Sequence, residues 1–231
     1  MSTRRTAGGQ RSGRPRKLTE DDLVRAVLAE GFAGITVPAV ARRLGVSTMT
    51  LYRYTPNRAE LLSLAWNHVI AGTVWPPVTG HWRPVLRAHA VALWQVLARH
   101  PGVVTELSGL VVPAEMMRRG DDMAVLLVEH GFSPPDAVLA LDLVMDLTID
   151  HRRGVETIHG LTGTPATLDA LADAWEPSAS DPPARRAVRA AMHDAIRTGP
   201  FDWYTKKLDL ALDGIAHRLA PPVPAAEGVN G

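Results

Sequence analysis

Apolar residues recur at helical spacing from residue 19 onward, and residues that favour helix ends divide this pattern into short segments. The first predicted helix begins after the N-cap Thr19, carries three acidic residues in its first turn and ends at Gly31. The apolar positions expected on its buried face are Leu23, Ala26 and Val27.

Two further short helices follow, and a glycine lies between them. One begins after Thr36 and ends at Gly45, where a left-handed turn carries no Cβ penalty. The other begins after Ser47 and ends at Tyr52, with Val46 and Leu51 holding it on the core. A short helix, a turn containing glycine and a second short helix are typical of a helix-turn-helix.

The rest of the pattern is also helical. A fourth helix, capped by Asn57, is predicted from Arg58 to about Val74, where the sequence Trp-Pro-Pro stops it. Further helices are predicted at 82–100, 103–110, 113–130, 134–159, 184–198 and 201–219. Residues 160–183 predict a long connection with one short helix near 168–174. No segment alternates like a strand, so the fold class is all-α.

These elements predict an N-terminal three-helix helix-turn-helix domain and a larger helical domain. The predicted parts are a flexible basic arm (1–17), the helix-turn-helix domain (18–74), the second helical domain (75–220) and a disordered tail (221–231). The arm has too little apolar surface to fold alone. Its cations are Arg4, Arg5, Arg11, Arg14, Arg16 and Lys17.

Composition narrows the class of protein. The formal net charge is only +1, so the basic arm is a local concentration of charge. The chain has no cysteine, no apolar run near the roughly 20 residues needed to span a bilayer, and no secretory signal, which predicts a cytoplasmic protein with no membrane partner. It also lacks the common nucleophile, phosphate-loop, zinc and dinucleotide motifs, so no enzyme is expected.

The segment TVPAVARRLGVSTMTLYRYTPNRAELLSLA resembles the DNA-binding domain of the tetracycline-repressor (TetR) family, which has the same Gly-Val turn, Leu-Tyr pair and Leu-Leu of helix four. This resemblance covers residues 18–68. Residues 82–101, 129–140 and 201–219 are more weakly similar to the C-terminal domain of the tetracycline-repressor branch. The resemblance implies that the second domain binds a ligand and forms a dimer.

The resemblance also implies that the third helix enters the major groove of double-stranded DNA. The residues expected to contact DNA are Thr36, Ser47, Thr48, Met49, Thr50, Tyr52, Tyr54 and Arg58. From the residues alone, hydroxyls on a helix too short to bury both faces are free to reach phosphates or base edges. The alternative is that these side chains only cap and solvate the helix.

Three positions depart from the family pattern. Arg58 stands where the family usually has a lysine, which keeps the charge that meets a phosphate. Pro38 replaces an arginine that reads bases in the tetracycline repressor, so the operator sequence cannot be transferred. Thr55 replaces an aromatic residue, which leaves the packing of that turn open.

His89 is a polar residue on an apolar helical face. Its position and that of Leu93 match ligand-contacting positions in the tetracycline-repressor branch, which makes both candidates for a binding pocket. Trp66, Trp94 and Met145 are further candidates. The alternative is a core histidine bonded to a backbone carbonyl, with the large apolar residues as ordinary core.

Acidic residues recur on the helix predicted at 134–159, at Asp142, Asp146 and Asp150. A metal site is conceivable, but like charges at this spacing usually mark a solvated or dimer-facing edge, which Arg185, Arg186 and Arg189 are expected to balance. No metal or cofactor is expected. The tetracycline repressor binds its magnesium complex through a histidine in the helix corresponding to 103–110, where this chain has none, so tetracycline itself is disfavoured.

The function predicted is a ligand-responsive repressor that binds a palindromic operator as a homodimer and is released by an unknown small, mostly apolar effector. Helix four is expected to touch both domains and, by shifting when a ligand binds, to transmit ligand binding to the helix-turn-helix. Dimerisation is expected through an apolar stripe on the last helix, formed by Leu208, Leu212, Ile215 and Leu219. The alternative is a helix-turn-helix protein without small-molecule control.

Overall fold

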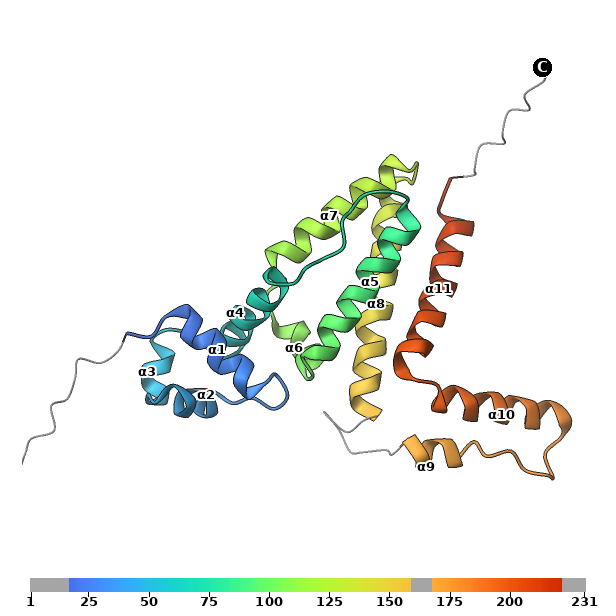
Figure 1. Ribbon diagram of the computed structural model, residues 1–231, viewed down its shortest axis with the longest axis horizontal. Coiled ribbons are helices and arrows are strands. Elements are labelled where there is room, and N and C mark those ends of the chain that lie inside the picture. Colours follow the sequence, from blue (N-terminus) through green and yellow to red (C-terminus); the bar gives the residue numbers. More distant parts are fainter. Residues whose placement is uncertain (1–16, 159–167, 222–231) are drawn as a thin grey trace, which may run out of the picture.

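The computed structural model describes residues 17–158 and 168–221, and all regular elements in these ranges are helices (Figure 1). The all-α fold class is therefore confirmed for this part of the chain. The predicted basic arm and C-terminal tail lie outside the described residues, except for Lys17 and Pro221.

The N-terminal helices begin where the sequence predicted. They are α1 (Glu20–Glu30), α2 (Val37–Leu44), α3 (Thr48–Tyr52) and α4 (Arg58–Ala71). Each N-cap side chain accepts a hydrogen bond from a backbone N–H of the first turn, and these caps are Thr19, Thr36, Ser47 and Asn57. Gly45 ends α2 with φ of 69°, a left-handed conformation that glycine adopts without strain.

Helix α4 ends three residues earlier than predicted. Its C-cap is Gly72, and the hydroxyl of Thr73 donates to Val69 O at 2.7 Å. The indole of Trp75 turns back and donates to Ile70 O at 3.1 Å. These two side chains satisfy carbonyls that would otherwise need another helical turn, so the chain leaves the helix before the two prolines.

The remaining elements match the predicted ranges closely. They are α5 (Trp82–Arg99), α6 (Val103–Glu106), the 3-10 turn η1 (Leu107–Gly109), α7 (Ala114–Glu129), α8 (Pro134–Ile158), α9 (Leu168–Asp173), α10 (Pro183–Arg197) and α11 (Pro200–Arg218). The predicted helix at 103–110 is in fact one α-helical turn followed by the 3-10 turn. The short helix predicted near 168–174 is present as α9.

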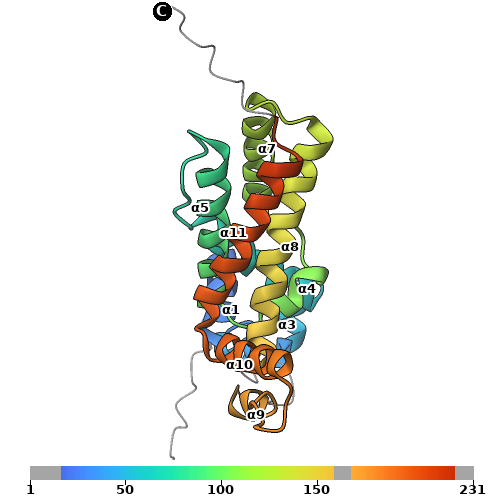
Figure 2. The same cartoon turned by 90° about the vertical axis from the view of Figure 1, so that its right-hand side faces the viewer.

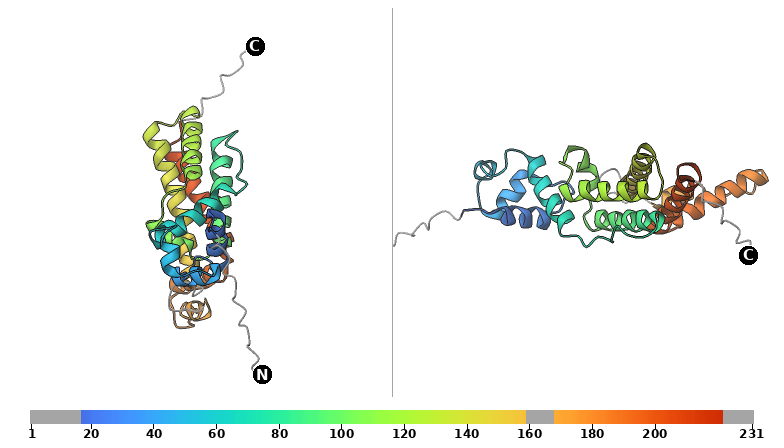
Figure 3. Two further views of the ribbon diagram at one scale, coloured as in Figure 1. Left: turned by 90° about the vertical axis from the view of Figure 1, so that its left-hand side faces the viewer. Right: turned by 90° about the horizontal axis from the view of Figure 1, so that it is seen from above.

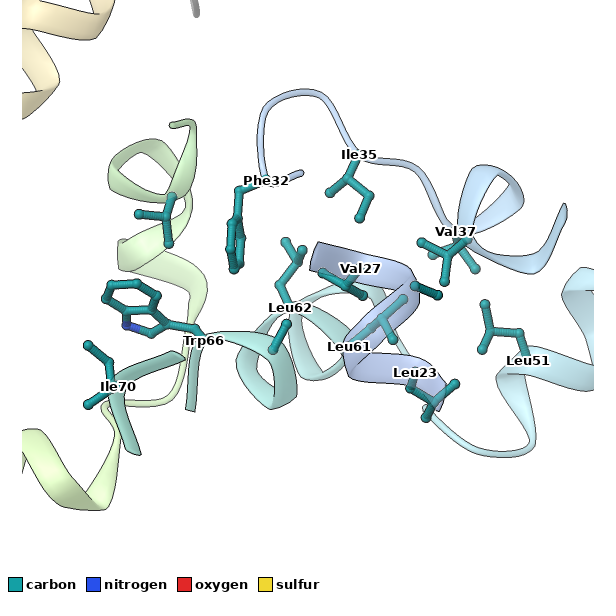
Figure 4. Close-up of a cluster of buried hydrophobic side chains, with 14 of the residues drawn as sticks. Leu23, Val27, Phe32, Ile35, Val37, Leu51, Leu61, Leu62, Trp66 and Ile70 are labelled. Atoms are coloured by element: carbon teal, nitrogen blue, oxygen red, sulfur yellow. The ribbon is translucent and has the colours of Figure 1, made fainter. Parts of the chain in front are cut away.

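A first core joins the helix-turn-helix to the second domain. In Figure 4, Leu23 and Val27 of α1 lie beside Leu61 and Leu62 of α4, and Phe32 stands edge-on to Trp66 with ring centroids 6.2 Å apart. The same core continues into α5 and α6 through Leu93, Val96, Leu97, Val103 and Val104. The helix therefore ends near the domain boundary predicted at residue 74, but the hydrophobic core continues from one domain into the other.

A second core lies among α5, α7, α8 and α11, which stand side by side as a bundle (Figures 1 and 2). Here one expectation is wrong: Leu208, Leu212 and Ile215 are at most 1% exposed, because α11 turns this stripe onto α5 and α8 of its own chain. Only Leu219 of the predicted stripe is partly exposed. The stripe therefore does not form a dimer surface.

Helix α10 lies apart from both cores. It projects from the lower end of the bundle, away from the helix-turn-helix, and packs on α9 (Figures 1 and 3). None of its residues is buried, although one side of it is strongly apolar. Such a helix needs a covering surface to bury its apolar side.

Candidate DNA-binding surface and effector cavity

Helix α3 presents one face to the core and the other to solvent. Leu51 is fully buried beneath it, whereas Met49 and Tyr52 are 75% and 46% exposed. Thr48 and Thr50 are partly exposed on the same outer side. The structure therefore brings these predicted contact residues together on one accessible surface.

Two of the other predicted contact residues act as helix caps. Ser47 Oγ accepts from the N–H of Thr50 at 3.1 Å, and Thr36 Oγ1 accepts from the N–H of Ala39 at 3.3 Å. A hydroxyl that caps a helix still has a hydrogen to donate. Capping and phosphate contact are therefore compatible for both residues, and Tyr54 is exposed beside them.

Sequence reasoning missed a group of cations around α3. A groove between α1, the α2–α3 turn and α3 is lined by Lys17, Arg25, Arg43, Thr50 and Arg53, among others. Acidic neighbours already pair with Arg25 and Arg43. Arg53 is exposed and has no ion-pair partner among the described residues. Its place between Tyr52 and Tyr54 was the signal available in the sequence.

Arg58 at the start of α4 links three elements. Its Nε donates to Ile35 O at 2.9 Å, directly before the cap of α2. Its Nη1 and Nη2 donate to the two carboxylate oxygens of Glu106 at 2.6 and 2.9 Å. The hydrogen bond from Arg58 lowers the pKa of Glu106, so the pair is charged at neutral pH. This bidentate pair joins the helix-turn-helix to α6, a contact that the sequence did not predict.

A second link lies along α4. Ser63 is buried, and its Oγ accepts a hydrogen bond from the N–H of Val111 at 3.2 Å. Val111 belongs to the segment that connects η1 to α7. The stretch from α6 to α7 is thus held to α4 at both Arg58 and Ser63.

This same stretch forms a wall of a cavity of about 340 Å³ in the second domain. Leu107, Leu110 and Val111 line it on that side, and Trp66 of α4 lines it from the helix-turn-helix side. The volume lies within the range of small-molecule sites, roughly 300–1,000 Å³. A molecule in the cavity would therefore touch the elements that hold the helix-turn-helix.

Four of the predicted pocket residues meet in this cavity: Trp66, His89, Leu93 and Met145. Trp94 does not line it, because adjacent helical residues point about 100° apart. Its indole instead stacks with Tyr204 and lies 3.4 Å from His151 Nδ1. The lining residues that sequence reasoning missed include Trp75, Met116, Arg119 and Met123, which come from segments distant in sequence.

The ionisable side chains that line the cavity are His89 and Arg119. His89 is 5% exposed, and its Nδ1 lies 3.0 Å from Val85 O. Burial lowers the pKa of His89, and the positive charge of Arg119 lowers it further. The imidazole is therefore neutral at pH 7, with Nδ1 carrying the proton that the carbonyl accepts.

A buried ion pair anchors α6 from the other side. Glu156 of α8 is fully buried, accepts from Arg152 Nε at 3.2 Å and accepts from the backbone N–H of Gly102 at 2.8 Å. The Arg152 guanidinium also lies over the Trp94 ring, 5.4 Å from its centroid. Gly102 immediately precedes α6, so the position of Glu106 depends on this pair.

The acidic row on α8 is exposed, but the predicted arginines do not balance it. Arg186 donates to Ala179 O and Asp181 O, and Arg189 pairs with Asp181 at 3.4 Å. Lys207 of α11 instead lines the same hollow as Asp146 and Asp150. Within the described ranges no three acidic or histidine side chains are grouped closely enough to hold a metal ion.

None of the described helices is long and apolar enough to cross a membrane.

Sequence comparison supports the helix-turn-helix and finds relatives among repressors. A sequence model for the helix-turn-helix domain of resolvase matches residues 13–58. The repressor DrrR1 of Streptomyces coeruleorubidus is 32% identical over 145 residues, 59% of this chain and 54% of DrrR1. The match thus spans about half of DrrR1. The class A tetracycline repressor of transposon 1721 from Escherichia coli is 27% identical over 87% of this chain and 92% of its own.

Structural comparison gives the same fold. ActR of Streptomyces coelicolor, solved in complex with actinorhodin, superposes with a TM-score of 0.71 at 19% identity, over 87% of this chain and 98% of ActR. These features define an all-helical fold with an N-terminal helix-turn-helix, which is also the fold of ActR. The chain is thus similar in sequence to transcriptional repressors and similar in fold to TetR-family proteins.

Proposed function

We propose that the protein is a repressor that binds a palindromic operator as a homodimer and releases it when a small, mostly apolar molecule enters the cavity. The observation that carries this proposal is that the cavity wall and the anchor of the DNA-binding domain are one segment. Glu106 pairs with Arg58, and Leu107 directly after it lines the cavity. A DNA-binding protein without ligand control would not need such a cavity.

For the DNA contact, we propose that α3 enters the major groove. Thr50 and Tyr52 would present hydroxyls to base edges, and Met49 would offer an apolar contact to a thymine methyl. Ser47, Thr48, Tyr54 and Thr36 would lie toward the phosphates. Arg53, exposed at the end of α3, adds a cation to the same surface.

For the dimer, we propose a surface formed by α8 and α10 in place of the buried stripe of α11. The supporting observation is the exposure of apolar side chains on these helices, namely Val138, Leu139, Leu143, Val188 and Met192. Beside Leu143 and Met192, the same hollow is lined by Asp146 and Asp150 of α8 and by Lys207 of α11. Opposite charges beside an apolar surface suit pairing of two copies related by a two-fold axis.

The expected result is a dimer in sedimentation at micromolar concentration, and enrichment of inverted repeats when the protein selects from random DNA duplexes. The half-sites should be centred about 34 Å apart, one helical turn of DNA. Leu139→Glu together with Leu143→Glu should yield monomers, whereas Leu210→Glu on the exposed side of α11 serves as the matched control. A monomeric wild-type protein, or selection of single half-sites, would contradict the proposal.

The second test concerns the link between cavity and DNA. Arg58 is partly exposed and is proposed to reach a phosphate, for which Glu106 competes. Glu106→Gln should therefore tighten operator binding about threefold to tenfold at low salt and steepen the salt dependence by up to about one unit. A cavity-binding compound weakens operator binding by some factor in the wild-type protein. In the Glu106→Gln variant this factor should be about fivefold smaller.

The compounds for this measurement are those from a library of apolar small molecules that raise the Tm of the wild-type protein. The matched control is Glu30→Gln, which removes the same charge from an ion pair with Arg43 inside the helix-turn-helix. That variant should keep the full response to the compound. If Glu106→Gln responds as strongly as Glu30→Gln, the pair does not transmit the signal.

A further inference from the structure

The cavity contains a hydrogen-bond acceptor that has no donor. His89 Nδ1 is occupied by Val85 O, and His89 Nε2 is buried with no hydrogen-bond partner among the residues that the structure describes. The carbonyl of Pro76 also lies near this ring, and it too can only accept. A buried polar atom without a partner loses its hydration, which costs about 1–3 kcal/mol. A donor supplied by a bound molecule would remove this cost.

The cavity also contains a cation that is only partly balanced. Arg119 Nε lies 2.8 Å from Glu115 Oε1, but its N–H does not point at that oxygen and makes no hydrogen bond. The same carboxylate also pairs with Arg118. One negative charge thus serves two guanidinium groups. No acidic residue in the described part of the chain lines the cavity, so the remaining positive charge is available to an occupant.

The side chains on the other walls of the cavity favour the binding of a flat aromatic ring system. Trp66 and Trp75 line the cavity, and the Arg119 guanidinium lies over the Trp75 ring at 5.3 Å from its centroid. Four methionines, Met116, Met117, Met123 and Met145, complete much of the lining. Thioethers and indoles make favourable contacts with aromatic rings.

We propose that the cavity binds a hydroxylated aromatic acid, with the hydroxyl donating to His89 Nε2 and an anionic oxygen accepting from Arg119. The inference rests on the proposed function, because it names the chemical class of the effector for that same cavity. A purely apolar molecule would leave His89 Nε2 without a donor. A molecule with only acceptor groups would satisfy Arg119 but would face two acceptors at His89.

The experiment compares matched probes on the full-length protein without DNA: naphthalene, 2-naphthol, 2-naphthoate and the isomers of hydroxy-2-naphthoate. Binding is followed by quenching of tryptophan fluorescence and by calorimetry. We expect 2-naphthol to bind about threefold to tenfold more tightly than naphthalene, since one hydrogen bond contributes about 0.5–1.5 kcal/mol. At least one hydroxynaphthoate isomer should bind more tightly than both 2-naphthol and 2-naphthoate.

Two variants test whether the hydroxyl of the probe bonds to His89 and whether its carboxylate bonds to Arg119. His89→Leu should abolish the advantage of 2-naphthol over naphthalene, and Arg119→Gln should weaken hydroxynaphthoate about tenfold while changing 2-naphthol less than twofold. The matched controls are His130→Leu and Arg118→Gln. His130 makes the same Nδ1 contact to a carbonyl outside the cavity, and Arg118 shares Glu115 but is exposed. Both controls should bind all probes like the wild type.

The outcomes separate this inference from the proposed function. If naphthalene and 2-naphthol bind equally and the acids bind no better, the cavity accepts apolar molecules and only the assignment to His89 and Arg119 is wrong. If none of the probes binds, the assignment of a hydroxylated aromatic acid is overturned, whereas the proposed function is overturned only if no compound of the apolar library raises the Tm and weakens operator binding. The comparison of probes on the wild-type protein decides this even if a variant fails to fold.

Discussion

Glu156→Leu is expected to lower the free energy of unfolding by about 3–5 kcal/mol, because it breaks a buried ion pair from one side. Glu156 is fully buried, and Arg152 is 8% exposed. The variant would leave the guanidinium without its carboxylate and the N–H of Gly102 without an acceptor. The loss corresponds to a fall in Tm of about 10 °C for a protein of this size.

The measurement is urea unfolding followed by circular dichroism and tryptophan fluorescence. Asp150→Asn is the matched control, because it breaks an exposed ion pair with Arg153 on the same helix and should cost at most about 1 kcal/mol. Combining Glu156→Leu with Arg152→Met should recover most of the loss, since a buried pair is often replaceable by apolar residues. A loss below about 1 kcal/mol for Glu156→Leu alone would contradict the account.

Local signals explain why the helices could be predicted. Thr19, Thr36, Ser47 and Asn57 cap the helices that they were expected to cap, because an N-cap depends only on the residue itself and the next three. Gly45 likewise ends α2 through its own backbone freedom. The end of α4 was missed because it depends on the Trp75 indole reaching back to Ile70 O.

The lining of the candidate cavity was only partly predictable. His89 and Leu93 could be found as a polar and an apolar residue on one helical face, and both line the cavity. Arg119 could not be found, because its role depends on how α7 packs against the start of α5 and on the Trp75 ring. For the apolar stripe of α11, the residues were identified correctly but the surface that they contact was not. Periodicity reveals that Leu208 and Leu212 face one surface, but not whether that surface belongs to the same chain or to a partner.

The sequence predicted that helix four touches both domains, but it did not indicate which residues form the contact. Arg58 and Glu106 are 48 residues apart, and their pairing depends on the placement of α6. That placement depends in turn on Gly102, whose N–H is held by Glu156. A glycine before a short helix is common at turns, so its close contact with another segment is visible only in three dimensions.

Gly102→Ala is expected to lower the free energy of unfolding by about 2–6 kcal/mol, from two independent causes. The residue has φ of 90°, where a side chain costs about 1–3 kcal/mol. A Cβ there would also lie 2.4 Å from the backbone N and 2.5 Å from the Cα of Ala33, in the loop between α1 and α2. Backbone atoms cannot rotate away as a flexible side chain does, so either this loop or α6 must move, at a further cost of about 1–3 kcal/mol.

The matched control for this substitution is Gly80→Ala. Gly80 has φ of 97°, but nothing lies within 4 Å of the position of its Cβ, so this variant carries the backbone strain alone. The two variants are compared by their free energies of unfolding in urea. The difference between them measures the energetic cost of placing a Cβ where the residue before α6 closely approaches the helix-turn-helix. Because the Ala33 loop leads directly to Ile35, which accepts from Arg58, we expect Gly102→Ala also to weaken operator binding at least fivefold under conditions where it remains folded. Equal stability and equal operator affinity in the two variants would mean that α6 does not set the position of the DNA-binding helices.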